Sequence, residues 1–330
     1  MADFPIVAVL GTGSIGLAHV RALRERLGLK VVAVPARGER RGQLAEQGID
    51  TAPDVATAAE MGARACVIAT DTGRHLDDAR AALRAGCHLL VEKPMTPDAR
   101  AARELRAAAI EAGRRVAVGY LLRFSASLNA FRARLPEIGA LHGVRVECQS
   151  YLPDWRPDRD YRASYSARRD EGGVLRDLIH EIDYAGWLFG WPAALHARVL
   201  NLGRLGIEGE EHADLAWEAA GGVPVSMTLD YLSRPSRRIM RASGAHGTLT
   251  WDGIEGAVTL ALAGRAPIVT RHPEGRDDWL AAQDRAFVEA IAGAVDARLA
   301  TAEDGVSALD VCDAARRASA TRREEPVECR

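Results

Sequence analysis

The feature that most constrains this chain is a glycine-rich turn directly after its first apolar segment. Residues 6–10 are apolar throughout, and Gly11-Thr12-Gly13-Ser14-Ile15-Gly16 follows them without a gap. The turn has the spacing GxGxxG, and a helical pattern begins at Ile15. Glycines at these positions permit a tight turn, close approach to a pyrophosphate, and packing of helix on strand. The sequence therefore predicts a dinucleotide site formed by all six residues; the alternative is a strand-to-helix turn without a ligand.

Beyond this turn, the apolar segments indicate two domains of different type. Up to about residue 120 they alternate with helical patterns, as in βαβ units that build a parallel sheet. After about residue 122, apolar and polar residues alternate, as in half-exposed antiparallel strands. A length of 330 residues also favours two domains. We expect a dinucleotide-binding domain over residues 1–122 and an α+β domain over residues 123–330.

The expected elements follow from these patterns. In the first domain, we predict strands at 6–10, 30–34, 65–69, 88–91 and 115–118, with helices near 15–27, 41–47, 76–85 and 97–112. In the second, we predict strands at 144–148, 195–202, 213–219, 225–229, 238–242, 248–251 and 258–262, with helices near 175–189, 279–294 and 305–320.

The charge balance points to a small-molecule partner. A total of 43 Lys and Arg residues against 45 Asp and Glu residues gives a net charge of −2 at pH 7, which argues against binding to nucleic acid or acidic lipid. No segment approaches the roughly 20 apolar residues of a membrane span. The first residues lack the basic start and apolar core of a signal peptide. We therefore expect a cytoplasmic protein with neither a membrane nor a nucleic-acid partner.

The five cysteines carry no metal or disulfide signature. They are odd in number, lack a CxxC or Cys/His spacing, and lie at Cys66, Cys87, Cys148, Cys312 and Cys329. We expect reduced, mostly buried thiols and no metal site, while a catalytic cysteine is the alternative.

The end of the second predicted strand bears on the choice of cofactor. An acidic residue there holds the ribose 2′-hydroxyl of NAD, whereas an arginine accommodates the 2′-phosphate of NADP. Pro35 stands where the acid is expected, and Arg37, Arg40 and Arg41 follow it. This pattern favours NADP over NAD; the alternative is that the arginines are ordinary solvated surface.

A lysine lies at the expected ligand-binding edge of the parallel sheet. Glu92-Lys93-Pro94 comes directly after the apolar strand 88–91, and open α/β sheets bind ligands at the carboxyl ends of their strands. An ammonium there could polarise a substrate hydroxyl or carbonyl and stabilise an alkoxide-like transition state. The alternative is a surface lysine before a helix that begins at Pro97.

A histidine and a carboxylate lie close together in the predicted helix 175–189. One apolar stripe at helical spacing contains Leu175, Leu178, Ile179, Ile182 and Phe189. Asp177 and His180, three residues apart, share the opposite side with Tyr184. A histidine beside a carboxylate is suited to general acid–base catalysis near neutral pH. The alternative is a surface pair, although the glycines just before the helix indicate a close approach to the backbone.

The segment 151–165, just before this helix, is rich in arginine and aromatic residues. Its candidate substrate contacts are Trp155, Arg156, Tyr161 and Tyr165. Guanidinium groups suit carboxylates or phosphates, and aromatic faces suit sugar rings or bases, which would fit an acidic or nucleotide-linked sugar. Because Asp154, Asp158 and Asp160 nearly balance the arginines, a loop with internal salt bridges is the alternative.

Taken in order, these motifs resemble the Gfo/Idh/MocA family, named for glucose-fructose oxidoreductase, inositol dehydrogenase and a rhizopine-catabolism protein. The resemblance rests on GTGSIG, residues 69–75, the EKP at 92–94, residues 119–124, the GGVLRDLIHEID segment and residues 301–305. It implies an α/β protein with an N-terminal Rossmann doubly wound parallel sheet and a C-terminal α+β domain with an open, mostly antiparallel mixed sheet. It also implies a homo-oligomer, dimer or tetramer, assembled through that sheet.

The same resemblance implies roles for individual residues. Lys93 matches the EKP lysine of the family, and His180 matches the catalytic histidine that accepts or returns the hydroxyl proton. Asp177 lies near the family's carboxylate, but it departs from the family's pattern because it stands three rather than four residues before the histidine. The remaining implied contacts are, for the cofactor, Thr70, Asp71, Thr72, His75 and Glu92, and for the substrate, Arg123.

The predicted function is therefore NAD(P)-dependent hydride transfer to or from a sugar, sugar acid, nucleotide-linked sugar or cyclitol. One alternative is an NAD-dependent glycosidase of the same family, which oxidises a sugar transiently, eliminates the aglycone and shows no net change in nicotinamide absorbance. A second is a non-catalytic sensor of cofactor and sugar. Retention of Lys93, Asp177 and His180 counts against a sensor, because binding alone needs no base.

Overall fold

The computed structural model describes residues 5–328, which form two compact units. The first unit contains the chain up to Phe124 together with Gly275–Val306, and the second contains Ser125–Glu274 together with the chain from Ser307 onward. The first unit differs from the predicted domain of residues 1–122, because a segment from late in the sequence packs with it. Contacts of this kind leave no periodic signal in the sequence.

A seven-stranded sheet in the order β15-β6-β5-β4-β1-β2-β3 forms the first unit. Its strands are β1 (Ile6–Leu10), β2 (Val31–Val34), β3 (Asp50–Thr51), β4 (Ala63–Ile68), β5 (His88–Val91), β6 (Val116–Val118) and β15 (Ala300–Thr301). Strands β1 to β6 run parallel, and only β15 is antiparallel to its neighbour. The strand order reverses between β1 and β4, which confirms the predicted doubly wound parallel sheet.

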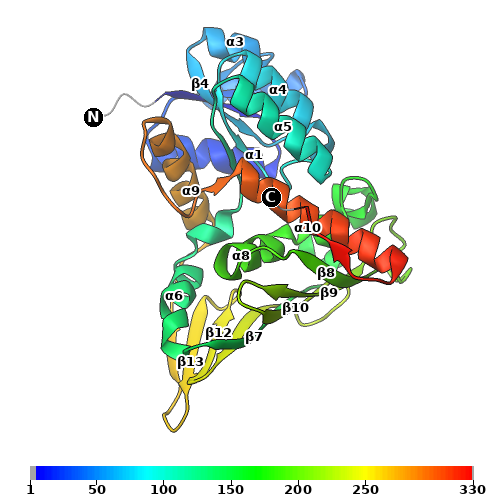
Figure 1. Cartoon of the computed structure of the whole chain (residues 1–330). Helices are drawn as coiled ribbons and strands as arrows, with labels where there is room; N and C mark the ends of the chain where they lie inside the picture. The colour runs from blue at the N-terminus through cyan, green and yellow to red at the C-terminus, as the bar shows by residue number, and fades with distance from the viewer. Residues whose placement is uncertain (1–4, 329–330) are drawn as a thin grey trace. The chain divides into compact units, whose positions relative to one another are not determined.

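Helices cover both faces of this sheet. They are α1 (Ser14–Arg21), α2 (Glu39–Glu46), α3 (Val55–Glu60), α4 (His75–Arg84), α5 (Ala99–Glu111) and α9 (Arg276–Ile291). In Figure 1, α3, α4 and α5 group together, apart from α1 and α9. Because both faces are covered, residues such as Val7 and Val9 of β1 have no exposed surface. Phe287 and Val288 of α9 complete the core beside Leu23.

The second unit is built on a nine-stranded sheet in the order β14-β13-β12-β11-β7-β10-β9-β8-β16. Its strands are β7 (Leu141–Gln149), β8 (Ala194–Leu200), β9 (His212–Ala219), β10 (Val223–Asp230), β11 (Arg237–Gly244), β12 (Gly247–Asp252), β13 (Ala257–Leu262), β14 (Ile268–Arg271) and β16 (Glu325–Pro326). Only β7 and β10 pair in parallel. This confirms the open, mostly antiparallel mixed sheet.

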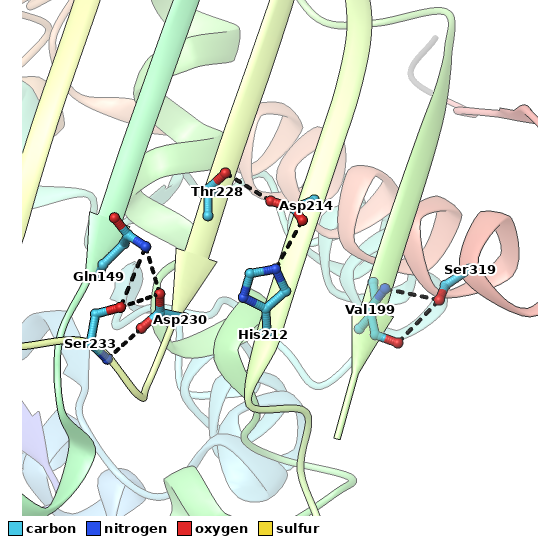
Figure 2. Close-up of polar contacts among 8 residues, drawn as sticks. All are labelled: Gln149, Val199, His212, Asp214, Thr228, Asp230, Ser233 and Ser319. Carbon is cyan, nitrogen blue, oxygen red and sulfur yellow. Dashed lines mark hydrogen bonds and ion pairs between the residues drawn. The ribbon is translucent and has the colours of Figure 1, made fainter. Parts of the chain in front are cut away.

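Helices pack on one face of this sheet. The helices that contribute residues to the second unit are α6 (Ala126–Arg134), α7 (Val174–Asp177), α8 (Ile179–Phe189) and α10 (Ala302–Thr321). Helix α6 packs on β12 and β13, α7 on β9 and β10, and α8 on β7. Towards the end of α10, the Ser319 hydroxyl accepts the Val199 amide at 2.8 Å and donates to the Val199 carbonyl at 3.1 Å, as Figure 2 shows.

On the face of the sheet opposite these helices, the strands carry polar side chains that hydrogen-bond to one another. Along β9, buried and exposed residues alternate strictly, as expected for a sheet with one packed face. Figure 2 shows Asp214 between two neighbours: the Thr228 hydroxyl donates to it at 2.8 Å, and the His212 ring lies 2.9 Å away. At the end of β10, Asp230 accepts from Gln149 at 2.7 Å and from the Ser233 hydroxyl at 2.8 Å.

Several short helical turns complete the fold. One π-helical turn, Ala22–Arg26, extends α1, so the helix predicted near 15–27 has nearly the expected length. The 3-10 turns are Thr72–Arg74, Leu121–Phe124, Leu135–Ile138, Leu152–Trp155, Tyr161–Ala163 and Tyr165–Ala167. Between residues 5 and 328, no helix combines the length and apolarity needed to cross a bilayer.

The cysteines within the described residues are all buried free thiols. They are Cys66, Cys87, Cys148 and Cys312, while Cys329 lies outside the described residues. Burial raises the pKa of each of these four thiols. An activated thiolate needs the opposite shift, so the alternative of a catalytic cysteine finds no support at these four positions.

Candidate functional site

The glycine-rich turn lies between β1 and α1, at the point where the strand order reverses. Gly11 adopts a φ of 83°, and a Cβ at this position would lie 2.5 Å from the Ala69 carbonyl oxygen. A Cβ at Gly16 would lie 1.9 Å from the Gly11 carbonyl oxygen. Helix α1 begins after Gly13 with no side-chain cap, so its first amides have no side-chain acceptor at that position. These features fit a phosphate-bearing dinucleotide.

A pocket of about 210 Å³ adjoins this turn. Its walls include Gly11, the Pro35–Ala36 segment after β2, and Thr70 after β4. The two carboxylates in its lining are engaged: Asp54 accepts the Thr57 amide at 2.8 Å, and Asp78 accepts the Thr70 hydroxyl at 2.7 Å. The end of β2 contributes only Val34, Pro35 and Ala36 to the lining, so it supplies no acid, as the sequence indicates.

Beside this pocket, three arginines follow the end of β2. Arg37 and Arg40 are exposed, and Arg41 is half-buried. Within residues 5–328, none of the three lies within 4.0 Å of a carboxylate oxygen. The three guanidinium groups therefore have no internal ion pair, although none of them lines the pocket itself.

The loop after β4 is held to the turn after β5 by a buried histidine. The His75 ring places Nδ1 3.0 Å from the Pro94 carbonyl oxygen and Nε2 3.0 Å from the Thr70 carbonyl oxygen. Burial lowers the pKa of His75 despite these two carbonyls. Thr72 is also buried, whereas Asp71 is exposed. The His75 ring therefore contacts backbone carbonyls on both sides, which ties the loop after β4 to the turn after β5.

Lys93 follows β5 at the edge of the sheet where the glycine-rich turn lies. The Glu92 amide donates to the Ile68 carbonyl at 2.9 Å, which fixes the turn against the end of β4. The Glu92 side chain is buried, and Lys93 is half-buried. The structure thus places Lys93 at the carboxyl ends of the strands, as the sequence predicts.

In the second unit, Asp177 is the centre of a buried polar cluster. The Tyr165 hydroxyl donates to its Oδ1 at 2.7 Å, while the Ser166 and Tyr231 hydroxyls donate to its Oδ2 at 2.6 and 2.9 Å. The charge of Asp177, together with burial, raises the pKa of Tyr165. Burial and then the same charge raise the pKa of Tyr231. Both phenols are therefore neutral donors at physiological pH, and they stabilise a carboxylate that is only 3% exposed.

The chain brings these hydroxyls to Asp177 through a close backbone approach. Gly172, just before α7, sits so close to Tyr165 that a Cβ would lie 2.1 Å from the Tyr165 carbonyl oxygen. The Gly173 amide donates to the Ser166 carbonyl at 3.1 Å. The close approach that these glycines predict is therefore found, and its partner is the loop segment itself.

The predicted continuous helix 175–189 is wrong in one respect, and so is the alternative that its Asp177 and His180 form a surface pair. The helix breaks at Leu178, which has a φ of −96° and a ψ of 29°, so Asp177 ends α7 and His180 belongs to α8. Asp177 and His180 are therefore not related by the spacing of one continuous helix. The alternative of a surface pair is also wrong, because Asp177 and His180 are both buried.

A pocket of about 240 Å³ lies under the loop that precedes α7. Its lining brings together all four loop residues predicted from sequence, Trp155, Arg156, Tyr161 and Tyr165. The Trp155 ring packs edge-on against Tyr231 with centroids 5.5 Å apart, and the Tyr161 hydroxyl donates to the Leu205 carbonyl at 3.0 Å. Because Tyr165 and Ser166 also donate to Asp177, the pocket wall and that cluster share two residues.

The acidic residues of the loop do not neutralise all of its arginines. Asp154 forms a bidentate pair with Arg234 at 2.8 Å for each bond, and Asp160 pairs with Arg162 at 3.9 Å. Elsewhere in the described chain, no carboxylate oxygen lies within 4.0 Å of Arg156 or Arg159, and both line the pocket. The alternative of a fully salt-bridged loop therefore fails for these two residues.

Arg123, predicted to contact substrate, has a different environment. It is 2% exposed and pairs with Asp304 at 3.0 Å within the first unit. Burial opposes ionisation of Asp304, but the Arg123 charge outweighs it and holds the pKa of that carboxyl below its usual value. The guanidinium is thus used within the core of the first unit, and we do not assign it to substrate.

Sequence reasoning missed four polar residues of these clusters. Ser166 and Tyr231 donate to Asp177, and His19 and Asp284 form a buried contact in the first unit. None of them belongs to a recognisable spacing, because their partners are distant in the chain. Within the described part of the chain, no group of three or more His, Cys, Asp or Glu side chains is arranged to hold a metal ion.

Comparison with protein families gives two matches along the chain. Residues 6–120 match the family model described as "Oxidoreductase family, NAD-binding Rossmann fold", under the name GFO_IDH_MocA. Residues 135–250 match the "GFO/IDH/MocA C-terminal domain". The first match covers most of the seven-stranded sheet, and the second covers β7 to β11 and most of β12.

Relatives in sequence include dehydrogenases and a reductase. Inositol 2-dehydrogenase of Streptomyces avermitilis is 31% identical over 192 residues, which cover 56% of this chain and 53% of that protein. 1,5-Anhydro-D-fructose reductase of Ensifer adhaerens is 31% identical over 154 residues, 44% of each chain. The chain thus matches about half the length of these curated relatives.

Solved structures share the whole fold. An inositol dehydrogenase homologue from Azotobacter vinelandii, complexed with NAD+, superposes with a TM-score of 0.86 at 20% identity over 98% of each chain. Levoglucosan dehydrogenase, complexed with NADH and levoglucosan, gives a TM-score of 0.87 at 19% identity over 98% of this chain and 99% of that one. At this level of identity, the likeness concerns the fold.

Two glycine substitutions separate ligand binding at the turn from its folding. Gly16→Ala forces a Cβ against the Gly11 backbone, so we expect the free energy of unfolding to fall by about 2 kcal/mol. A Cβ at Gly13 meets nothing within 4 Å. Gly13→Ala should therefore fold normally and yet lose about tenfold or more in dinucleotide affinity, because the methyl group obstructs the pyrophosphate. Thermal unfolding and fluorescence titration measure the two effects, and unchanged affinity in Gly13→Ala contradicts this site.

Proposed function

Because this chain belongs to the Gfo/Idh/MocA family of oxidoreductases, we propose that it catalyses NAD(P)-dependent hydride transfer to or from a carbinol or carbonyl carbon of a sugar or cyclitol. The observation that carries the proposal is the Asp177 cluster in the second unit, which shares Tyr165 and Ser166 with a pocket. The buried His180 follows three residues later, on α8. The glycine-rich turn of the first unit supplies the dinucleotide site.

The residues of the chain have separate tasks in this reaction. The bound dinucleotide supplies the hydride acceptor, or the donor in the reverse direction. We assign His180 as the general base that takes the hydroxyl proton during oxidation and returns it during reduction. We assign Asp177, which accepts hydrogen bonds from three hydroxyls, as the residue that orients this proton transfer. The Lys93 ammonium stabilises the alkoxide-like oxygen.

Substitution of His180 tests this assignment. We expect His180→Ala to lower kcat by about 10²–10⁴-fold, which is the usual contribution of a general base, and Lys93→Ala to lower it as well. His196→Ala is the matched control, because His196 is an exposed histidine on β8. The measurement is the change in nicotinamide absorbance across polyols, uronates and nucleotide sugars.

Two outcomes of this assay contradict the assignment. If a substrate is turned over and His180→Ala keeps full activity, the histidine is not the base. If an aglycone is released without net change in nicotinamide absorbance, the chain is instead a glycosidase that uses its cofactor transiently.

We further propose that the substrate carries a negative charge, as a sugar acid or a nucleotide-linked sugar does. Arg156 and Arg159 line the loop pocket together with Trp155 and Tyr161, and neither guanidinium has a carboxylate within 4.0 Å in the described chain. The one acid of the lining, Asp160, pairs with Arg162. Guanidinium groups pair well with carboxylates and phosphates, and aromatic rings pack against sugar rings or bases.

The two arginines give a direct test of substrate charge. We expect Arg156→Ala with Arg159→Ala to raise KM for uronates, sugar phosphates or nucleotide sugars about tenfold or more, as loss of charge-assisted hydrogen bonds does. KM for neutral polyols should stay nearly constant. Arg168→Ala is the matched control, since Arg168 already pairs with Glu171 at 3.0 Å and does not line the pocket. An equal effect on neutral and anionic substrates contradicts the proposal.

For the cofactor, we propose that NADP is accepted in preference to NAD. Pro35 and Ala36 offer no acid to a ribose 2′-hydroxyl, and Arg37, Arg40 and Arg41 follow them directly in the chain. An arginine there pairs with a 2′-phosphate.

Arg37→Ala should separate the two cofactors. We expect kcat/KM for NADPH to fall about tenfold, the usual scale of one charge-assisted contact, while kcat/KM for NADH changes little. Arg84→Ala is the control, because Arg84 is an exposed arginine in the last turn of α4 and does not line the pocket. A wild-type preference for NADH that Arg37→Ala leaves unchanged overturns this choice.

We also propose a cytoplasmic homo-oligomer, a dimer or a tetramer, assembled through the nine-stranded sheet. A shallow groove of about 530 Å³ crosses strands β7, β9, β10 and β11 and includes His142 and Arg145. Its lining also carries the polar side chains of Ser226, Arg241 and Ser243, which a second copy could contact across a symmetric interface.

A further inference from the structure

Three titratable side chains of the first unit meet in its interior. The His19 ring on α1 places Nδ1 2.8 Å from Oδ1 of Asp284 on α9, and Nε2 3.1 Å from Oε1 of Glu92 after β5. His19 and Asp284 are fully buried, and Glu92 is 6% exposed. The cluster thus joins the helix of the glycine-rich turn to the residue immediately before Lys93.

We propose that His19 is a positioning residue that fixes the Glu92 carboxylate and, through it, the turn that carries Lys93. The inference rests on the proposed function, because it matters to catalysis only if Lys93 acts on the substrate.

The protonation of His19 fits this arrangement. Burial lowers the pKa of His19, but the charge and hydrogen bond of Asp284, joined by those of Glu92, outweigh burial and raise it to about 10. The ring is therefore an imidazolium at neutral pH and donates from both nitrogens. Burial opposes the ionisation of Glu92, yet His19 and the Lys93 charge together lower the pKa of Glu92. Lys93, Glu92 and His19 thus alternate in charge.

Both oxygens of the Glu92 carboxylate accept a hydrogen bond. Its Oε1 accepts from His19, and its Oε2 accepts the Lys93 amide at 3.3 Å. Gly119, after β6, leaves just enough room, since a Cβ there would lie 2.7 Å from Oε1 of Glu92. Loss of the His19 contact would therefore release the acceptor of the Lys93 amide.

Stability alone is a poor explanation for this cluster. A buried ionic group of this kind contributes little more than apolar residues of similar volume, because desolvation opposes the Coulomb attraction. What the ionic group adds is directional hydrogen bonding, which fixes one geometry. The rival explanation is a structural tie between α1 and α9 through Asp284 alone.

Two amide substitutions distinguish positioning from a structural tie. The amide nitrogen of asparagine can replace Nδ1 of His19 and keep the Asp284 contact, whereas that of glutamine can replace Nε2 and keep the Glu92 contact. If His19 acts through Glu92, His19→Asn should lower kcat about tenfold or more beyond His19→Gln, as small displacements near the chemistry do. The affinity for NADH, measured by fluorescence, should differ less than about threefold between them.

Hydrogen exchange of the ligand-free protein provides a readout independent of turnover. We expect the peptide over residues 88–96 to exchange faster in His19→Asn than in His19→Gln, because the Lys93 amide loses its fixed acceptor. Both substitutions are also made together with Asp284→Asn, which removes the unneutralised buried carboxylate and keeps the comparison possible if His19→Gln does not fold.

The outcomes separate this inference from the proposed function. If His19→Asn equals or exceeds His19→Gln in kcat and shows no faster exchange, His19 is only a structural tie and the inference is overturned. If Lys93→Ala keeps wild-type activity, the role of Lys93 in the proposed function fails instead. Loss of activity in Lys93→Ala, with lower kcat and faster exchange in His19→Asn than in His19→Gln, supports both.

Discussion

The first unit depends on how closely the ends of β1 and β4 approach each other. At Gly11, a backbone with positive φ passes so near to Ala69 that any Cβ would lie 2.5 Å from its carbonyl oxygen. Because the strand order reverses here, helices leave the two strands in opposite directions and an opening for a ligand forms between them. The turns that carry Thr70 and Lys93 lie at the same edge of the sheet. Close backbone contact thus places the glycine-rich turn and Lys93 at the same edge of the seven-stranded sheet.

The second unit is organised around a buried charge. In the interior, the hydroxyls of Tyr165, Ser166 and Tyr231 donate to Asp177 in place of water. These donors come from the loop before α7 and from the end of β10, so the carboxylate holds the two segments together. The same loop walls the pocket that contains Arg156 and Arg159. One segment, the loop before α7, therefore both supplies donors to the buried Asp177 and forms the wall of the pocket.

Local features could be predicted from sequence because short-range sterics and periodicity determine them. The glycine-rich turn, the Glu92-Lys93 segment after β5 and the alternation along β9 are all found where expected. Features without a local pattern were missed. Strand β14 is largely exposed and shows no apolar periodicity, and the break at Leu178 interrupts an otherwise regular apolar stripe.

The sequence by itself determined the fold class, the dinucleotide turn and the types of residue available for proton transfer. Only the tertiary structure decided which polar groups meet. His19 and Asp284 are 265 positions apart, and Asp177 and Tyr231 are 54 apart, so no spacing rule connects them. The structure likewise decided that Arg123 is buried against Asp304. Arg156 and Arg159 instead line a pocket, and no carboxylate of the described chain lies within 4.0 Å of either guanidinium. The reason is physical: burial makes an unpaired charge costly, and only the packed chain determines which charges are buried and which partners reach them.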